Sequence, residues 1–249
     1  MKNTALITST IAPDPGVVDL KRNNARDRLN DYLTAFHFYC ECLRENIFTN
    51  IVYVDNSAWP LDDFRKIGME LELSHRIEFI SYKSTTDPNN NRLYLELDLI
   101  EEAIQKSHFL SDDPRSIIWK ITGRYMIKNI GRIVAACRAR DGIDVYVNCR
   151  DLPFRYVDFF LAGFNLASYA RIFSNNRHLY QGTLPGEIIL RQYLDNENLS
   201  GIKVMRRFPV VPRVVGVRGY DGTSYSSLSG LMKFYIRCTL SAVFPKLWV

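Results

Sequence analysis

The chain has 249 residues, of which 47% are hydrophobic and 24% charged. This is long and apolar enough for a sizeable core, and it excludes disordered, collagen-like and coiled-coil proteins. The net charge of +5 is uneven, because residues 203–249 hold eight basic and one acidic side chain whereas residues 1–202 hold 24 and 26. A basic tail favours a partner that carries phosphate groups.

Strand-like segments alternate with helix-like segments along the chain. In order, the pattern predicts a strand at residues 5–10, a helix at 26–44, a strand at 50–54, a helix at 60–73, a strand at 76–82, a helix at 93–110, a strand at 116–122, a helix at 130–140, a strand at 143–149 and a helix at 186–194. Helical segments between strands imply βαβ units, so we expect an α/β domain with a mostly parallel sheet.

The cysteines and histidines exclude two common classes of protein. There are five cysteines, an odd number, and Cys40 and Cys42 form a lone C-x-C. No disulfide framework follows, which favours a reducing compartment. The four histidines form no metal-binding pattern, so zinc hydrolase chemistry is poorly supported. The apolar run at residues 5–7 is too short for a signal peptide, and no run is long enough to span a membrane.

Polar residues follow the predicted strands where each one ends. These strand ends read Thr8-Ser9-Thr10, Asp55-Asn56-Ser57, Thr122-Gly123-Arg124-Tyr125 and Asn148-Cys149-Arg150-Asp151. In an open parallel sheet, ligands bind beyond the carboxyl ends of the strands, so we expect a small-molecule site there. The glycine motifs of dinucleotide-binding and P-loop proteins are absent, as is the nucleophile elbow of α/β-hydrolases.

Two of these strand ends suggest specific contacts with a ligand. Asp55 could accept hydrogen bonds from a ribose or a base, although an Asp before Asn and Ser also suits a turn or a helix cap. In the segment 119–125, Gly123 would let a ligand approach the backbone, and Arg124 offers a planar fork for phosphate oxygens. The alternative is an arginine that pairs with a carboxylate at the rim of the sheet.

Two acidic residues are candidates for a general base. Glu187 begins a predicted helix, where the helix dipole would hold its carboxylate ionised, although helix capping alone explains such a residue. Asp158 lies among aromatic residues and could accept a bond from a sugar hydroxyl. It could equally pair with Arg155.

The tail combines a basic charge with an apolar helix at about residues 227–244. Lys233 and Arg237 lie one turn apart among apolar residues that include Phe234, and Trp248 follows. Such a segment suits a membrane interface. The alternative is a C-terminal helix packed on the sheet. No DNA-recognition or RNA-binding motif is present, so we expect no nucleic-acid partner.

Taken together, the chain resembles glycosyltransferases of bacterial capsule and O-antigen loci with a GT-A-like (Rossmann-type) nucleotide-sugar domain. The resemblance covers roughly residues 4–225. It is carried by the segments L-I-T-S-T, Arg28 with Tyr32, V-Y-V-D-N-S, the helix at 96–106, I-I-W-K-I-T-G-R-Y and P-G-E-I-I-L. It implies a donor site formed by Thr8, Ser9, Asp55, Asn56, Lys120, Thr122, Gly123, Arg124 and Tyr125.

The resemblance also implies the chemistry. Arg124, helped by Lys120, would stabilise the leaving diphosphate, and Glu187, or failing that Asp158, would be the base. The D-x-D motif that holds a divalent metal in this fold is missing at Thr122-Gly123-Arg124. No cofactor is therefore firmly predicted. Manganese or magnesium would need other ligands, for which Asp144, Asp151 and Asp158 are candidates.

The expected protein has a GT-A-like domain at residues 1–202 and a basic segment at residues 203–249 that rests on an anionic membrane surface. We expect it in the cytoplasm, peripheral on the inner face of the cytoplasmic membrane. It would transfer a sugar, with inversion, from a nucleotide sugar to a hydroxyl of a lipid-linked glycan of capsule, O-antigen or lipopolysaccharide. Two alternatives stay open: a glycan- or anionic-lipid-binding protein without catalysis, and a nucleotidyltransferase.

Overall fold

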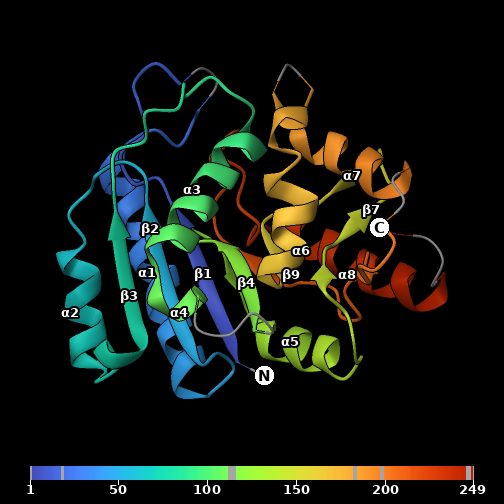
Figure 1. Ribbon diagram of the computed structural model, residues 1–249, viewed down its shortest axis with the longest axis horizontal. Coiled ribbons are helices and arrows are strands. Elements are labelled where there is room, and N and C mark those ends of the chain that lie inside the picture. The colour runs from blue at the N-terminus through green and yellow to red at the C-terminus, as the bar shows by residue number, and fades with distance from the viewer. Residues whose placement is uncertain are drawn as a thin grey trace.

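A seven-stranded sheet forms the middle layer of the molecule (Figure 1). The computed structural model describes residues 2–17, 20–111, 116–181, 184–196, 199–244 and 248. The sheet order is β10 (Val204–Met205), β6 (Val145–Tyr146), β9 (Leu161–Phe164), β4 (Ile117–Thr122), β1 (Asn3–Ser9), β2 (Asn50–Asp55) and β3 (Ile77–Ser81). Neighbouring strands are parallel except at β9, which is antiparallel to β4 and β6.

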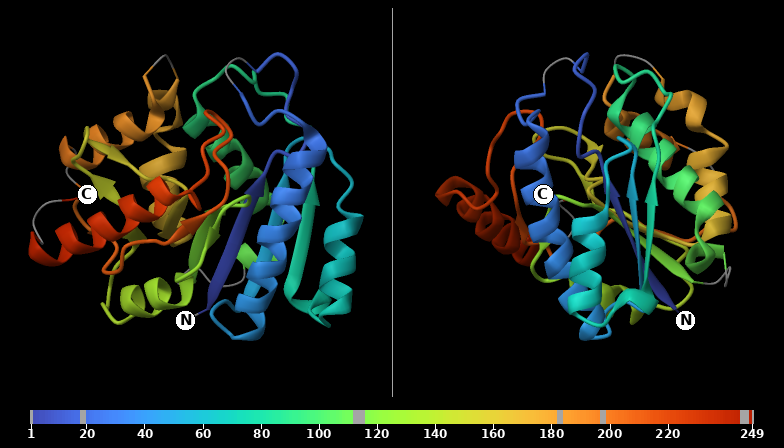
Figure 2. Two further views of the ribbon diagram at one scale, coloured as in Figure 1. Left: turned by 180° about the vertical axis from the view of Figure 1, so that it is seen from behind. Right: turned by 90° about the vertical axis from the view of Figure 1, so that its left-hand side faces the viewer.

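Helices cover both faces of this sheet. The α-helices of the described residues are α1 (Ala25–Arg44), α2 (Asp62–Glu70), α3 (Arg92–Lys106), α4 (His108–Ser111), α5 (Ile130–Arg138), α6 (Leu166–Tyr169), α7 (Gly186–Asn196) and α8 (Leu228–Val243), the last of which has no buried residue. Figure 2 shows α1 and α2 on one side of the sheet and α3 on the other. The predicted fold class, a Rossmann-type α/β domain with a mostly parallel sheet flanked by helices, is confirmed.

Short elements complete the fold around the sheet. Single 3-10 or π turns occupy Ser74–Arg76, Ala170–Ser174 and Arg177–Tyr180. Two small antiparallel pairs join β5 (Met126–Ile127) to β11 (Val214–Val215) and β7 (Cys149–Arg150) to β8 (Tyr156–Val157). Because β10 and β11 come from the basic segment 203–249, that segment contributes strands to the same body as the rest of the chain.

The core divides into two layers because side chains alternate along each strand. On β1, Ala5 and Ile7 pack in the layer that contains α1, whereas Leu6 packs in the layer that contains α3. The helices were recognisable because their apolar residues recur every three or four positions. On α1 this stripe includes Tyr32 and Phe36, both of which are buried.

Several boundaries differ from the sequence prediction. The helix predicted at residues 93–110 is divided at Ser107, whose hydroxyl accepts a hydrogen bond from the Leu110 amide and so begins α4. The strand predicted at residues 143–149 contributes to two sheets, β6 and β7. The antiparallel strand β9 was not predicted, because its four residues carry too little periodicity to be recognised.

The carboxyl ends of β1, β2 and β4 meet at one edge, as expected. Ser9 pairs in register with Asp55, and Thr8 pairs with Thr122. Gly123 continues β4 so close to β1 that its amide donates to the Thr8 carbonyl at 2.8 Å. The absence of a side chain at Gly123 therefore serves the contact between two strands.

Replacing Gly123 with alanine should destabilise the protein. A Cβ atom there would lie 2.7 Å from the Thr8 carbonyl oxygen. Overpacking of this kind lowers the free energy of unfolding by about 1–3 kcal/mol, which urea denaturation would measure. In the control Gly68→Ala, on α2, the new Cβ atom would meet nothing closer than 3.4 Å, so stability should be unchanged or higher. Equal stability of Gly123→Ala and the wild type would contradict the packing argument.

Candidate active site

Two cavities lie side by side at the carboxyl edge of the sheet. The first cavity lies beyond β1 and β2 and has a volume of 380 Å³. We call it the nucleoside-side cavity. The second cavity contains Glu187, the candidate general base, and is called the base-side cavity for that reason. It has a volume of 430 Å³ and lies beyond β4, against the start of α7. Arg92, Glu96, Arg124 and Tyr220 line both cavities and therefore form their junction. The expected location of a small-molecule site thus coincides with a continuous cleft.

Asp55 organises the loop that follows β2. One of its carboxylate oxygens accepts bonds from the Ser9 hydroxyl and the Ile11 amide, at 2.9 and 3.0 Å. The other accepts from the amide and the hydroxyl of Ser57, at 2.9 and 2.6 Å, and from the Trp59 amide at 3.3 Å. These bonds support the turn interpretation of Asp55. A contact between Asp55 and a nucleoside stays a prediction.

Asn56, the next residue, lines the nucleoside-side cavity. Its backbone is held on both sides, since its amide donates to the Ser9 carbonyl and its carbonyl accepts from the Ser84 amide. Its side-chain oxygen is buried and has no hydrogen-bond partner in the part of the chain that the structure describes. Burying an acceptor without a partner costs about 1–3 kcal/mol, so this oxygen is suited to a donor group that arrives with a ligand.

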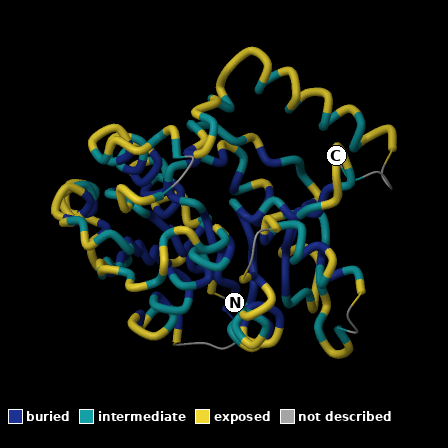
Figure 3. The backbone as a smooth tube through the Cα atoms, turned by 90° about the horizontal axis from the view of Figure 1, so that it is seen from above, coloured by how far each residue is buried: buried dark blue, intermediate teal, exposed yellow. Residues whose placement is uncertain are grey.

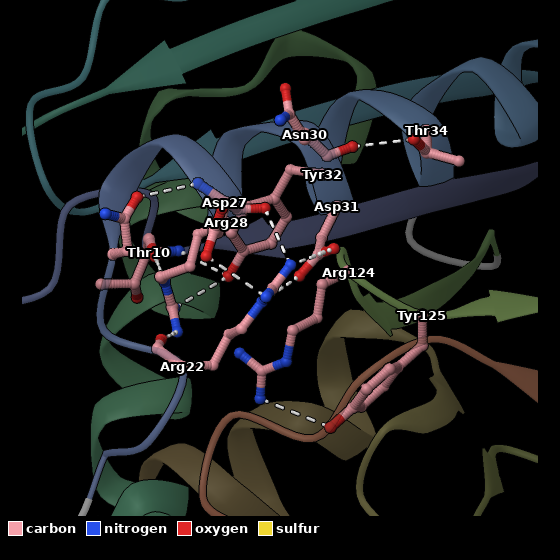
Figure 4. A network of polar contacts seen from close by, with 11 residues as sticks. Thr10, Arg22, Asp27, Arg28, Asn30, Asp31, Tyr32, Thr34, Arg124 and Tyr125 are labelled. Atoms are coloured by element: carbon pink, nitrogen blue, oxygen red, sulfur yellow. Dashed lines mark hydrogen bonds and ion pairs between the residues drawn. The ribbon is translucent and has the colours of Figure 1, made fainter. Parts of the chain in front are cut away.

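Arg28 and Tyr32 lie one turn apart on α1 and hold the backbone that follows β1 (Figure 4). The Arg28 guanidinium donates to the Thr10 carbonyl, with its Nε atom at 2.8 Å. The Tyr32 hydroxyl accepts from the Thr10 amide at 3.1 Å. Burial lowers the pKa of Arg28, and the nearby Arg124 lowers it further. Two arginines therefore lie together beside the nucleoside-side cavity.

Arg124 is the cation at the junction of the two cavities. Its guanidinium makes a long contact of 3.4 Å with the Tyr125 hydroxyl, and its buried Nε atom has no hydrogen-bond partner among the described residues. Within the described parts of the chain, no carboxylate forms an ion pair with it. Gly219 approaches so closely that a Cβ there would lie 3.0 Å from Arg124. The rim ion pair that was the alternative for Arg124 is therefore not formed by the described residues.

Lys120, in contrast, is fully engaged by its neighbours. Its side chain is 1% exposed, and its Nζ atom lies 2.7 Å from a Glu96 carboxylate oxygen. It also donates to the Thr122 hydroxyl at 3.0 Å and to the Phe159 carbonyl at 2.7 Å. The Thr8 hydroxyl donates to the same Glu96 oxygen. Burial lowers the pKa of Lys120, and Glu96 counteracts this effect.

Glu187 faces this network from the start of α7. Asn91 joins the two helices here, since its side-chain oxygen accepts from Leu93 at the start of α3 and from Gly186 at the start of α7. Gly186 is needed because a Cβ atom would lie 2.4 Å from the Leu93 Cβ. This close packing brings the Glu187 side chain to the base-side cavity, together with Arg124 and Lys120.

Burial raises the pKa of the Glu187 carboxyl above its usual value. The positive charges of Arg92 and Lys120 oppose this rise, and the negative charge of Glu96 adds to it. A carboxyl group with a raised pKa holds a proton more readily than a free glutamate does. Such a group is suited to accept a proton from a hydroxyl near neutral pH.

Asp158 also lines the base-side cavity, but its partner differs from the one suggested by the sequence. It forms an ion pair with Arg150, not with Arg155, and it accepts a bond from Asn148 at 3.1 Å. Arg155 instead lies near Asp151 and Asp195. The Asp158 carboxylate is already occupied by Arg150 and Asn148, so Glu187 is the better candidate for the base.

The other acidic residues considered as metal ligands are also engaged. Asp144 accepts from Asn165 and from the Lys203 amide, and Asp151 pairs with Arg191 at 2.9 Å. Among the residues whose placement is described, no group of three or more His, Cys, Asp or Glu side chains is arranged to hold a metal ion.

The tail residues predicted at a membrane lie on and around α8. Phe234 is half-buried and lines a third cavity together with Lys233 and Arg237. Trp248 lies against the body, where the Arg191 guanidinium is 4.8 Å from its ring. No helix in the described residues is long and apolar enough to cross a bilayer.

Comparison with known proteins yields only distant structural similarity. No family model and no curated protein matches the chain. A candidate glucose-1-phosphate thymidylyltransferase from Bacillus anthracis, solved with a sucrose, is 11% identical over 94% of each chain, with a TM-score of 0.49. A candidate nucleotide-diphospho-sugar transferase from Desulfovibrio desulfuricans G20 is 15% identical over 83% of this chain and 80% of that chain, with a TM-score of 0.45. Similarities this distant say nothing about what this chain binds.

Sequence reasoning missed four residues at the centre of the site: Arg28 as a cavity residue, Arg92, Glu96 and Tyr220. Arg92 and Glu96 lie at the exposed start of a helix, where charged residues are common and carry no signal. Tyr220 belongs to a loop far from Arg92 in the sequence, and the Arg92 guanidinium lies 4.5 Å from its ring. Only the spacing of Arg28 and Tyr32, one helical turn apart, was visible in the sequence.

Removing the Glu187 charge should change how stability depends on pH. Because its pKa is raised on folding, the folded state binds the proton more tightly than the unfolded chain. Its contribution to stability should therefore fall as pH rises from about 4.3, the ordinary glutamate pKa, through the raised value. The melting temperature of Glu187→Gln relative to the wild type should increase over this window. A difference that stays constant or decreases would contradict the raised pKa.

Proposed function

We propose that the protein transfers a sugar from a nucleotide-sugar donor to a hydroxyl group of an acceptor. One observation carries this proposal: Arg124, which has no acidic partner among the described residues, lines the same cavity as Glu187, a carboxyl with a raised pKa. The first is suited to a diphosphate and the second to a hydroxyl proton. A reaction that needs both groups side by side is the displacement of a nucleoside diphosphate by an alcohol.

In this proposal the nucleoside occupies the cavity beyond β1 and β2. The unpartnered side-chain oxygen of Asn56 accepts a hydrogen bond from the base or the ribose. The diphosphate lies at the junction, between the guanidinium groups of Arg124 and Arg92. Arg28 adds positive charge nearby, although its own hydrogen bonds go to backbone carbonyls and to the Tyr32 hydroxyl. The sugar then extends into the base-side cavity, towards Glu187.

The transfer is a direct displacement at the anomeric carbon. Glu187 takes the proton of the acceptor hydroxyl, whose oxygen forms a bond to that carbon. The bond between the carbon and the diphosphate oxygen breaks, and the electron pair leaves with the nucleoside diphosphate. Arg124 stabilises the negative charge that develops on this leaving group. A displacement with one base and no covalent intermediate inverts the anomeric centre.

The carboxyl edge of β4 offers no ligands for a divalent metal at the diphosphate. Thr122, Gly123 and Arg124 supply one hydroxyl and a cation where carboxylates would be needed. The described acidic residues near the cleft are not clustered for a metal either. The residues therefore do not fit manganese or magnesium, and the proposed steps depend on the arginines instead.

We extend the proposal to a lipid-linked glycan as the acceptor, at the inner face of the cytoplasmic membrane. The support is the basic tail and the apolar surface of α8, where six large side chains from Leu228 to Phe244 are exposed. Soluble proteins rarely expose such a continuous apolar stripe without a partner. Synthesis of a bacterial surface polysaccharide such as capsule or O-antigen is a process that uses such acceptors.

Two other functions are less well supported. A binding protein without catalysis would not need an acid of raised pKa beside Arg124, yet Glu187 and Asp158 both line the base-side cavity. A nucleotidyltransferase would need clustered carboxylates for its magnesium ions, and the described residues offer no such cluster. Each alternative function predicts a result that the following experiments distinguish from sugar transfer.

The first test is a thermal-shift screen with nucleoside diphosphates and their sugars in the presence of EDTA. A ligand that binds only the folded state raises the melting temperature by mass action. The substitution Arg124→Gln should remove most of this shift and lower turnover by more than about tenfold, because it removes charge stabilisation of the leaving group. Arg132→Gln, on the exposed surface of α5, is the matched control and should behave as the wild type. A shift that appears only with a nucleoside triphosphate and magnesium would favour the nucleotidyltransferase.

The second test separates binding from transfer. Glu187→Gln should keep the shift caused by a nucleoside diphosphate while turnover falls to background, because the amide cannot accept the hydroxyl proton. In the wild type, turnover should rise with pH through the raised pKa of Glu187. Unchanged turnover in Glu187→Gln would move the base elsewhere. A wild type that binds the ligand and transfers nothing to any acceptor would favour the binding protein.

A further inference from the structure

Helix α8 presents its apolar side chains away from the body of the protein. Leu228, Met232, Tyr235 and Ile236 are 86%, 63%, 61% and 52% exposed, and they recur every three or four residues, so they lie on one face. None of the residues of α8 is buried. Figure 3 shows this helix along the perimeter of the molecule, in intermediate and exposed colours only. This outward apolar face has no partner in the described residues.

The opposite side of α8 borders a cavity of 340 Å³. Five basic residues line it, whereas Asp221 is the only acidic residue in its described lining. The basic residues are Arg150, Arg213, Arg218, Lys233 and Arg237. Hydroxyl groups of the loop that precedes α8 line it as well, among them Ser224 and Ser227. Cations and hydroxyls together are the groups that bind phosphate.

Arg237 is a half-buried cation of this cavity, and no described carboxylate forms an ion pair with it. Arg150 is paired with Asp158, and Arg218 lies 3.6 Å from Asp221. Arg237 forms no ion pair or hydrogen bond with any described residue. Burial lowers its pKa, the neighbouring charge of Arg150 lowers it further, and the Asp158 carboxylate that pairs with Arg150 counteracts part of this effect. A half-buried cation beside a second cation is costly unless an anion joins them.

We propose that this cavity binds the phosphate of an anionic membrane lipid while the outward face of α8 lies in the bilayer surface. The inference deepens the proposed function, because it gives the lipid end of the acceptor a binding place. The cavity shares Phe160, Arg218, Asp221 and Tyr225 with the base-side cavity. A glycan attached to a phosphate held there reaches towards Glu187 without leaving the protein surface.

Charge decides between a membrane and a second copy of the chain as the partner of α8. The helix carries Lys233 and Arg237 and no acidic residue, and the tail from residue 203 onward has eight basic residues and one acidic. Two copies joined through α8 would bring two such basic tails close to each other. An anionic bilayer compensates them and accepts the apolar face, as interfacial helices do.

The test measures binding to vesicles of phosphatidylcholine alone and of equal parts phosphatidylcholine and phosphatidylglycerol. The wild type should bind the anionic vesicles, and added salt should weaken this binding. Met232→Glu should lower the partition coefficient by more than about tenfold, because it places a charge in the apolar face. Met69→Glu is the matched control, since Met69 on α2 is 62% exposed and lies outside all three cavities. It should bind as the wild type does.

The phosphate site has its own variant. Arg237→Gln should lower binding to the anionic vesicles by about fivefold and leave binding to phosphatidylcholine unchanged. Arg132→Gln removes an equal charge from α5 and should have no effect on either. Equal binding of Arg237→Gln and the wild type to anionic vesicles would overturn the phosphate site. Inorganic phosphate could also raise the melting temperature of the wild type by as much as anionic vesicles do. That result would assign the cavity to free phosphate instead.

The outcomes also separate this inference from the proposed function. If no nucleotide shifts the melting temperature but Met232→Glu and Arg237→Gln release the protein from vesicles, the sugar transfer fails and the lipid site stands. If nucleotides bind but the wild type does not bind anionic vesicles, the proposed lipid site is wrong. A dimer in sedimentation that Met232→Glu dissociates, without vesicle binding, would assign α8 to a second copy.

Discussion

The buried ion pair between Lys120 and Glu96 is the interaction on which the arrangement of the cleft depends. Lys120 comes from β4 and Glu96 from α3, and the Thr8 hydroxyl of β1 completes the contact. The charge of the buried Lys120 could not be removed from water without the Glu96 carboxylate, since an unpaired buried charge costs several kcal/mol. The pair therefore ties the start of α3 to the middle of the sheet. That position of α3 brings the two cavities to a common boundary.

The charges around the cleft differ in how they are compensated, and this difference separates structure from chemistry. Lys120 is held by a carboxylate, a hydroxyl and a carbonyl, so its charge is used inside the fold. Arg124 and Arg237 have no acidic partner among the described residues, although both line cavities. Cations that the fold leaves uncompensated are the ones suited to an external phosphate. The same reasoning favours Glu187 over Asp158 as the base, because Asp158 is already paired.

Much of the fold followed from local patterns. The helices at α1 and α7 and the strands β1, β2 and β4 were predicted close to their observed bounds, because their apolar residues keep one period over many positions. The antiparallel strand β9 was missed because it is short and its pairing partners are distant in sequence. For the candidate site, the sequence singled out the strand ends and Glu187, which line or border the cavities, but not Glu96 and Arg92, since a charged residue at a helix start has the same local pattern whatever it faces.

The order of residues along the chain was sufficient to specify an α/β sheet, its polar carboxyl edge, the candidate base and a basic amphipathic tail. Each of these depends on periodicity or on neighbours within a few positions, which a linear pattern contains. The state of each charged group depended on tertiary packing instead. Whether Lys120 or Arg124 is free for a ligand follows from a carboxylate on a distant helix. Whether α8 packs on the sheet or faces outward depends on where the rest of the folded chain places it, because burial is a property of the tertiary structure.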